Sequence, residues 1–354
     1  WAAGVEHRAN STSGAQAGDI DKGGCGSARK SAHSAQAVRP LVPTRSTFPT
    51  MNSPLRLPVW RRIPPALLLI FLAPLIAEVL PGATRFSSLF VLPVEMCVWG
   101  GGALIIREAA RKWRLGWCGR IFLALALAVA EETLIQQTSL APMVLKLKGA
   151  EYARALGINY VYLLWALVYE TVFVVLVPIA LVEYLAPERR DDAWIRRKGM
   201  VATGLFFTLG CFLAWYSWTR LARPNVFHVP IYNPSVNTVL SAVLIIASLV
   251  VTAIAARKAS VRSASPPPLA ALGGGGALWA VLWYGLVLLG FGIAPTFPPT
   301  VAIVAGLFLA ATPLCLLPRW SAHASWSPRH TFAVFSGTIA GSMLVSFIGF
   351  IGAA

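Results

Sequence analysis

The sequence predicts an all-α fold, a polytopic transmembrane helix bundle with about nine spans. Hydrophobic residues make up 56% of the 354 residues and charged residues only 12%, whereas soluble domains carry about 25% charged residues. The mean hydropathy is +0.66. Apolar runs of about twenty residues recur along the chain, and this is the length that crosses roughly 30 Å of hydrocarbon. These observations indicate an integral membrane protein whose main partner is the lipid bilayer.

The first fifty residues differ in composition from the rest of the chain. They begin with Trp1, contain no methionine, and are rich in Ser, Ala, Gly and Thr without periodicity. The first methionine is Met51. The residues before it lack the pattern of a secretory signal, which is a positively charged region, an apolar region and a small-residue cleavage site. We therefore expect 1–50 to be a disordered leader or mis-assigned upstream sequence, and 51–354 to form a single transmembrane helical domain.

Nine apolar runs are long enough to form helices in a membrane. They lie at 64–80, 88–106, 119–139, 159–183, 200–218, 236–256, 270–293, 299–317 and 332–352. The first run begins with Pro64 and Pro65, and proline is tolerated there because the first amides of a helix have no intrahelical acceptor.

Glycines predict where these helices pack closely. Gly337 and Gly341 form a small-xxx-small pair on the last run, which is a common contact device between helices in lipid. Gly100–Gly102 and Gly273–Gly276 predict either close helix contact or a broken helix.

Lys and Arg are distributed unevenly between the two sets of loops. With the Met51 end in the cytoplasm, the inward segments carry about three times as many Lys and Arg residues as the outward ones. The inward segments are 56–62, 107–120, 189–198, 257–262 and 319–329. Because cytoplasmic loops are enriched in Lys and Arg, we expect an N-in/C-out topology. The Ala-, Arg- and Pro-rich composition favours the plasma membrane of a bacterium.

Composition also excludes some classes of function. The net charge of +16 arises from basic residues spread over short loops, which is a topology signal and predicts no nucleic-acid partner. The five cysteines are scattered without paired spacing, so neither a disulfide framework nor a zinc site is expected.

Acidic residues inside the apolar runs are the main functional signal. Glu131 and Glu132 interrupt the third run, although a charge at the centre of a membrane helix costs about 2.5–3.5 kcal/mol. At 1.5 Å per residue, Glu131 lies about 16 Å from the inner face and Glu170 about 15 Å from the outer face. Both depths are close to the midplane, and Glu95 lies slightly further outward. No Lys or Arg is expected at this depth.

Without a basic partner, these carboxylates are neutral, bind a cation, or face a water-filled cavity. Hydrogen bonds would come from neighbouring polar side chains, namely Thr133, Gln136, Gln137, Thr138 and Tyr169. Three further glutamates (Glu78, Glu108 and Glu183) lie nearer to helix ends, and we expect them to be interfacial.

The glutamate pair, followed some forty residues later by a polar residue at matching depth, resembles the CAAX-protease and bacteriocin-processing family of intramembrane peptidases. That family has an EExxxR motif, then FxxxH, then a third motif with His and Asn or Asp. The chain has Glu131 and Glu132 but Gln136 at the arginine position, and it has Glu170 near the position of the second-motif histidine. For the third motif, His228 and either Asn233 or Asn237 are the nearest candidates. The resemblance implies a water-activating site, altered or inactive in this chain, and it extends to uncharacterised bacterial membrane proteins with the glutamate pair.

Three hypotheses of function follow. In the first, the chain is a peptidase-like enzyme with Glu131 or Glu132 as general base and Glu170 in place of histidine, supported by Glu95, Gln136 and Tyr169. The carboxylates would also suit a divalent cation such as Mg²⁺, Ca²⁺ or Mn²⁺, although no motif specifies a metal or cofactor. In the second, the same glutamates serve a proton- or cation-coupled transporter. In the third, the protein is a structural membrane protein without catalysis. The partner would be a membrane peptide under the first hypothesis and a small ion under the second.

Overall fold

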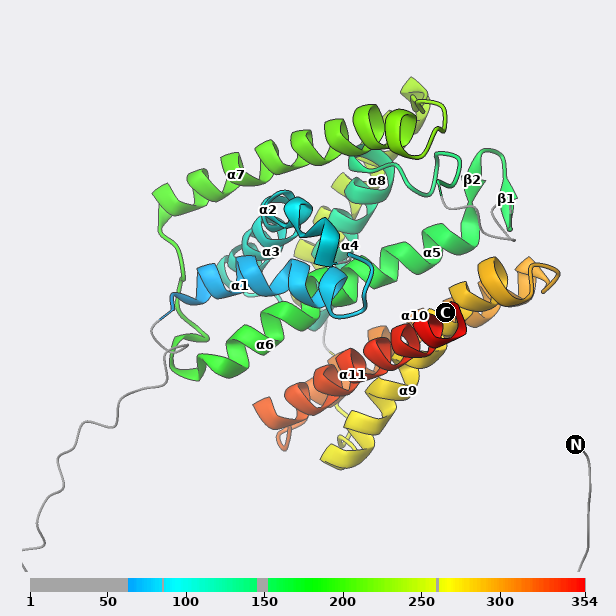
Figure 1. Cartoon of the computed structure of the whole chain (residues 1–354). Helices are drawn as coiled ribbons and strands as arrows, with labels where there is room; N and C mark the ends of the chain where they lie inside the picture. The colour runs from blue at the N-terminus through cyan, green and yellow to red at the C-terminus, as the bar shows by residue number, and fades with distance from the viewer. Residues whose placement is uncertain (1–62, 85, 145–151, 259–260, 354) are drawn as a thin grey trace, which may run out of the picture. The chain divides into compact units, whose positions relative to one another are not determined.

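A computed structural model describes residues 63–84, 86–144, 152–258 and 261–353 (Figure 1). The predicted leader, 1–50, lies outside these residues. In the described part of the chain the only strands are β1 (Arg154–Ala155) and β2 (Ile158–Asn159), which pair antiparallel in a small hairpin. All other regular structure there is helical, so the predicted all-α class is confirmed.

Helices occupy all nine predicted positions. The first three positions hold α1 (Pro65–Pro74) with η2 (Leu75–Val79); then η3 (Phe86–Val91), α2 (Leu92–Glu95), η4 (Met96–Gly100) and α3 (Gly101–Lys112); and then α4 (Trp117–Ala130) with η5 (Glu131–Ile135). The fourth to sixth hold α5 (Tyr160–Tyr169), η6 (Glu170–Leu176) and α6 (Val177–Leu185), which a short η7 (Pro187–Arg189) follows; then α7 (Arg197–Trp215) with η8 (Tyr216–Val226); and then α8 (Val236–Ala255) with η9 (Ala256–Lys258). The last three hold α9 (Leu269–Val287) with η10 (Leu288–Ile293), then α10 (Pro299–Ser321), and then α11 (Pro328–Ala353). The elements η2, η4, η5, η6, η8 and η10 are π-helical, and η3, η7 and η9 are 3₁₀-helical.

Seven of the helical stretches in the described residues are long and apolar enough to cross a membrane. They are Ser88–Lys112, Tyr160–Leu185, Arg197–Val226, Val236–Ala255, Leu269–Ile293, Pro299–Ser321 and Pro328–Ile348. The other two predicted spans fall short for different reasons. Pro65–Val79 is too short, and the α4–η5 stretch carries Arg120 as well as Glu131 and Glu132. The pattern is that of a multi-pass membrane protein.

The stretch from α5 to α6 lies at the centre of the packing. Its apolar window is 78% buried, whereas that of α8 is only 11% buried. All seven residues of η6 are buried, and η6 contacts α4, α1, α3 and η4. The central helix therefore has protein on every side, and α8 leaves most of its apolar surface for lipid.

The predicted glycine contacts are confirmed. A Cβ on Gly337 would lie 2.0 Å from the carbonyl oxygen of Gly273, and one on Gly341 would lie 2.3 Å from that of Ala277. A Cβ on Gly100 would lie 2.4 Å from the carbonyl oxygen of Ile70. Glycine is therefore required where α11 meets α9 and where η4 meets α1, and both glycine groups lie in continuous helical structure, not at breaks.

An ion network joins the ends of α3, α4 and α6, at the end of the bundle that the sequence predicts to face the cytoplasm. Arg107 Nη1 lies 2.5 Å from Glu108 Oε1, and Arg107 Nε lies 3.6 Å from Glu183 Oε1. Arg120 pairs with the other oxygen of Glu183 at 3.2 Å. Glu108 and Glu183 are buried within the protein at this end of the bundle, and their interfacial depth in a membrane stays a prediction. Arg107 is the residue that compensates both charges.

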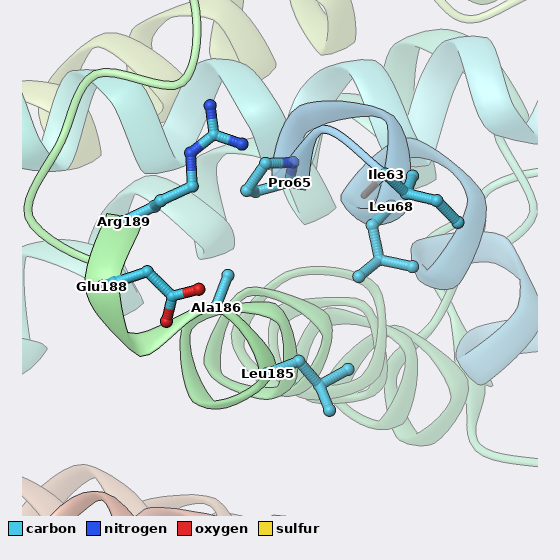
Figure 2. Close-up of a pocket in the computed structure, with 7 residues that line it drawn as sticks. All are labelled: Ile63, Pro65, Leu68, Leu185, Ala186, Glu188 and Arg189. Carbon is cyan, nitrogen blue, oxygen red and sulfur yellow. The ribbon is translucent and has the colours of Figure 1, made fainter. Parts of the chain in front are cut away.

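Among the pockets in the described part of the chain, two lie between helices. The pocket in Figure 2 lies where the start of α1 meets the end of α6, and it is lined by Ile63, Pro65, Leu68, Leu185, Ala186, Glu188 and Arg189. The second is an apolar groove between α6 and α11, lined by Val177, Ala180, Leu181, Thr331, Phe332, Phe335, Ser336 and Ile339. Neither contains a glutamate from the interior of a predicted span.

Candidate functional site

The structure brings together the three glutamates that the sequence singles out. Glu131 and Glu132 begin η5, Glu170 begins η6, and α4 with η5 packs against the central stretch. The three residues are 2%, 3% and 6% exposed. The carboxyl groups of Glu132 and Glu170 interact with each other, and Glu131 interacts electrostatically with both.

Ser139 fixes the position of Glu132. Its backbone N–H donates to Glu132 Oε2 at 2.9 Å, and its hydroxyl donates to the same oxygen. Ser139 reaches Glu132 because the chain reverses after η5 at Gln137, which has a left-handed φ of 60°. The carbonyl of Ser139 accepts the N–H of Asn159 at 3.0 Å, so the β1–β2 hairpin holds this turn in place.

The hydrogen bonds that Glu132 accepts from Ser139 indicate which carboxyl group of the Glu132–Glu170 pair is more readily protonated. A bond between two carboxyl groups requires a proton on one of them. Ser139 donates twice to Glu132, which favours the ionised form of that carboxylate. In a bond between the two groups, Glu170 is therefore the favoured donor and Glu132 the favoured acceptor.

Glu131 lies in the same place without a partner of its own. Gln136 and Trp99 lie beside it, but neither oxygen of Glu131 accepts a well-formed hydrogen bond. The indole N–H of Trp99 and one oxygen of Glu170 also lack partners. Buried polar groups are nearly always hydrogen-bonded, and each unpaired one costs about 1–3 kcal/mol. Free donors and acceptors at one buried position are what a water molecule or a polar substrate group requires.

Glu78, which the sequence places nearer to a helix end, belongs to the same site. The hydroxyl of Tyr169 lies 3.0 Å from Glu78 Oε1 and also donates to the carbonyl of Ala77. The hydroxyl of Thr84 lies 3.1 Å from a carboxylate oxygen of Glu78 and 3.1 Å from one of Glu95. Glu78 and Glu95 are partly exposed, which makes them the accessible side of the site.

These contacts also restrict where protons lie. Thr84 has a single hydroxyl proton and donates to one carboxylate at a time. Its contacts with Glu78 and Glu95 are both hydrogen bonds only if one of the two carboxyl groups is protonated.

We call Glu78, Glu95, Glu131, Glu132 and Glu170 the carboxylate cluster. Glu78 interacts electrostatically with Glu95, Glu131 and Glu170, so the five groups act on one another. None of them forms an ion pair with any Lys or Arg that the structure describes.

Every member of the carboxylate cluster lies in or beside a π-helical stretch. Glu78 is in η2, Glu95 directly precedes η4, Glu131 and Glu132 begin η5, and Glu170 begins η6. A π-helical turn contains an extra residue, which redirects side chains and is frequent at functional sites. Two further π-helical stretches, η8 and η10, carry no carboxylate, so the feature accompanies the cluster without defining it.

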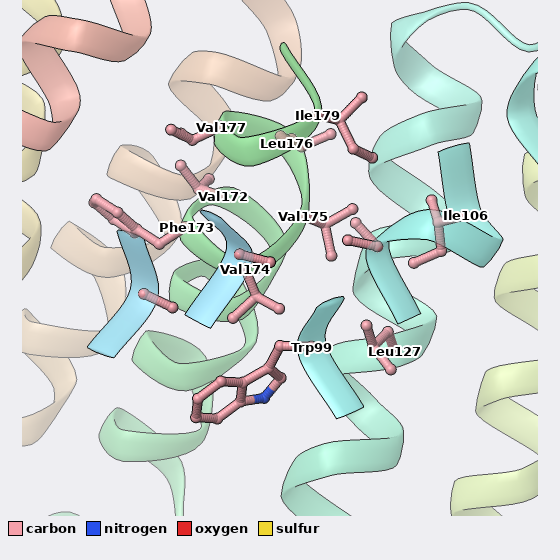
Figure 3. Close-up of a cluster of buried hydrophobic side chains, with 14 of the residues drawn as sticks. Trp99, Ile106, Leu127, Val172, Phe173, Val174, Val175, Leu176, Val177 and Ile179 are labelled. Carbon is pink, nitrogen blue, oxygen red and sulfur yellow. The ribbon is translucent and has the colours of Figure 1, made fainter. Parts of the chain in front are cut away.

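Apolar packing separates the carboxylate cluster from the ion network. Three helical stretches reach from one site to the other. Each has a residue in or beside the carboxylate cluster at one end and a residue of the ion network at the other: Glu170 and Glu183 on η6–α6, Glu131 and Arg120 on α4–η5, and Trp99 and Arg107 on η4–α3. The residues between them form the core in Figure 3, which includes Leu127, Val172, Val174, Val175, Leu176 and Val177. The cluster is therefore closed on the side of the ion network.

Histidine and metal chemistry find no support in the described residues. No group of three or more His, Cys, Asp or Glu side chains there is arranged to hold a metal ion. His228, the nearest histidine for a third peptidase motif, is exposed in the turn after η8. Asn233, one of the two asparagine candidates, accepts a hydrogen bond from Arg220. The site consists of carboxyl, hydroxyl and indole groups.

Comparisons with protein-family models, with curated proteins and with solved structures find no match for this chain. A function is therefore inferred from the geometry of the site.

Proposed function

We propose that the chain is a multi-pass membrane enzyme in which Glu132 and Glu170 form an acid–base pair that hydrolyses a peptide bond within the membrane. The single observation that carries this proposal is the buried juxtaposition of the two interacting carboxyl groups, with Ser139 donating twice to Glu132. Two carboxyl groups that share one proton are the working arrangement of carboxyl peptidases.

Each carboxyl group has a defined role in this reaction. The ionised Glu132 takes a proton from water, and the resulting hydroxide forms a bond to the peptide carbonyl carbon. Glu170 gives its proton to the carbonyl oxygen as the tetrahedral intermediate forms. The proton held by Glu132 then passes to the leaving amine as the C–N bond breaks, and the acid product returns a proton to Glu170.

The unpartnered groups beside the pair provide contacts for the reactants. Both oxygens of Glu131 are free to accept from water, and the N–H of Trp99 is free to donate to a developing oxyanion. We place Gln136, Tyr169 and Glu95 in supporting roles.

The resemblance to CAAX-type peptidases supports the same assignment. Glu131 and Glu132 match the glutamate pair of that family, and Glu170 takes the role of the second-motif histidine. Because Gln136 replaces the arginine, we propose an altered member that works with carboxyl groups alone. We further propose that it lies in a bacterial plasma membrane with the N-in/C-out topology.

The test is cleavage of model membrane peptides by the purified full-length protein in liposomes. Glu132→Gln and Glu170→Gln are each expected to lower kcat by about 10²–10⁴-fold, which is the usual contribution of a general acid or base. Glu188→Gln is the matched control, because Glu188 is an exposed carboxylate at the end of α6 and its loss should leave the rate unchanged. Wild-type rates in both site variants would contradict the proposal.

Proton-coupled transport is the second candidate, and one observation favours it. The carboxylate cluster runs from the partly exposed Glu78 and Glu95 to the buried Glu170, and apolar residues close it beyond that point. Such one-sided access suits a carrier that takes up protons on one face. Flux that depends on a pH gradient in proteoliposomes and disappears in Glu132→Gln, without peptide cleavage by the wild type, would select this candidate. If the variants changed only the folding yield, the cluster would be structural.

A further inference from the structure

The apolar groove between α6 and α11 lies on helices that can span a membrane. Its walls include Val177 and Ala180 on α6 and Phe332, Ser336 and Ile339 on α11, and none of the described residues that line it is charged. Both helices belong to stretches that are long and apolar enough to cross a bilayer, and the apolar window of α11 is only 22% buried. In a bilayer, the medium that meets this groove is therefore hydrocarbon and not water.

A basic side chain lies at one end of the groove. On α11, Arg329, Phe332, Ser336 and Ile339 follow one another at intervals of three or four residues, so they lie on one face of the helix. Arg329 is exposed, and its side chain forms no ion pair or hydrogen bond with any other residue that the structure describes. The helix face that lines the groove therefore ends in a cation that has no partner in the described part of the protein.

The position of Arg329 along α11 indicates its depth. The apolar stretch Pro328–Ile348 has 21 residues, which corresponds to about 31 Å at 1.5 Å per residue, close to the roughly 30 Å of a hydrocarbon core. Because Arg329 is at the start of this stretch, we expect it at the level of the lipid headgroups. Ile339 lies about 15 Å further along the helix. The groove thus leads from the headgroup level toward the middle of the bilayer.

Aromatic contacts hold the walls of the groove in place. The ring of Phe332 stacks on that of Tyr184 at the end of α6, with 4.4 Å between the ring centroids and 18° between the ring planes. The ring of Phe335 packs against that of Trp117 on α4, with 5.8 Å between the centroids. Neighbouring helices therefore fix both phenylalanines, and a ligand finds a groove that is already formed.

We propose that this groove binds the acyl chain of an anionic phospholipid whose phosphate group contacts Arg329. A phospholipid has a charged head and apolar chains, and Arg329 with the groove offers the complementary groups in the same order along the membrane normal. A guanidinium matches the oxygens of a phosphate, and basic residues near the membrane surface attract anionic lipids. The start of α11 adds the positive end of a helix dipole. The site does not depend on the proposed peptidase activity.

Native mass spectrometry of the purified full-length protein in detergent tests this proposal. The protein is mixed with phosphatidylglycerol or with phosphatidylcholine, and the lipid-bound fraction is measured as the lipid concentration rises. We expect the wild type to bind phosphatidylglycerol more tightly. Arg329→Gln should lower the affinity for phosphatidylglycerol about fivefold, the usual contribution of one basic residue, and should affect phosphatidylcholine less because choline offsets the phosphate charge. Ser336→Phe fills the groove and should lower the affinity for both lipids.

Two control variants distinguish this site from general contact with lipid. Arg319→Gln removes an exposed charge near the end of α10, a helix that contributes none of the residues lining the groove. Ser248→Phe adds the same ring to the exposed surface of α8. Both variants should bind the two lipids as the wild type does. If Ser336→Phe does not fold, Arg329→Gln decides the question, because Arg329 is exposed.

Three results would overturn the proposal. The first is equal affinity of the wild type and Arg329→Gln for phosphatidylglycerol. The second is the absence of lipid binding by the wild type. The third is a dimer of the wild type that Ser336→Phe dissociates, since a second copy of the chain would then cover the groove.

Discussion

The backbone N–H and the hydroxyl of Ser139 donate to the same carboxylate oxygen of Glu132. Ser139 is fully buried, so this contact is not shared with solvent. It makes Glu132 the better acceptor of the Glu132–Glu170 pair and so favours Glu170 as the protonated partner. Ser139 is therefore the positioning residue of the proposed acid–base site.

Ser139→Ala tests this relationship. The backbone donor remains and the hydroxyl is lost, so we expect kcat for a model membrane peptide to fall about tenfold, corresponding to a hydrogen bond to a charged group. KM should change little, because Ser139 does not contact substrate in the proposed mechanism. Ser248→Ala is the control, since Ser248 is exposed on α8 and bonds only within its helix. A rate equal to that of the control would show that the hydroxyl does not assist Glu132.

Thr84→Val tests the link between Glu78 and Glu95. Valine has nearly the same shape but no hydroxyl, so both contacts are lost and we expect a stability loss of about 1 kcal/mol. Chemical unfolding of the reconstituted protein measures it. Thr84→Ser should restore the stability, whereas Thr208→Val, which removes an exposed hydroxyl from α7, should change it little. Equal values for Thr84→Val and Thr208→Val would mean that the two carboxyl groups do not depend on the link.

Arg107→Ala tests the ion network. It leaves the buried Glu108 without its closest partner, and it removes the hydrogen bonds from Arg107 to the carbonyls of Arg190 and Asp192. Removal of one partner from a buried ion pair costs about 3–5 kcal/mol, so we expect a large loss of unfolding free energy.

Arg190→Ala is the comparison for that network. The side chain of Arg190 is 44% exposed and lies 3.9 Å from Glu183, and exposed pairs of this kind contribute about 0–1 kcal/mol. A similar loss in the two variants would contradict the central role of Arg107.

Gly337→Ala tests the contact between α9 and α11. The added Cβ would lie 2.0 Å from a backbone oxygen that cannot move aside by itself, so the two helices must separate. We expect a loss of about 1–3 kcal/mol, as for other overpacked contacts. Gly274→Ala is the control on α9, because its Cβ would meet nothing within 4 Å. It should be neutral or stabilise the helix by up to about 1 kcal/mol.

Cysteine labelling tests the N-in/C-out topology. In a background without the native cysteines, Asn225→Cys should react with a membrane-impermeant thiol reagent in intact cells. Ser325→Cys, in the turn between α10 and α11, should react only after permeabilisation. Both positions are exposed, so an absence of reaction reports the side of the membrane and not burial. The reverse pattern would show that the orientation is inverted.

The convergence of Glu131, Glu132 and Glu170 could be anticipated because helical rise converts position along a run into depth in the membrane. Glu78 could not be anticipated in this way. Its depth along α1–η2 suggested an interface, and only the packing of α1–η2 against the central stretch places it beside Tyr169. The burial of Glu183 within the protein likewise depends on a residue of another helix, Arg107.

The sequence by itself determined the membrane class, the positions of the helices and the acidic residues that interrupt apolar runs. These properties follow from the length and polarity of single segments. The tertiary structure decided which polar groups meet: Ser139 with Glu132, Thr84 with two carboxylates, and Arg107 with Glu183. Those contacts depend on how helices rotate and pack against one another, and on π-helical turns that shift side chains off the regular 3.6-residue period. No local pattern in the chain encodes either of these.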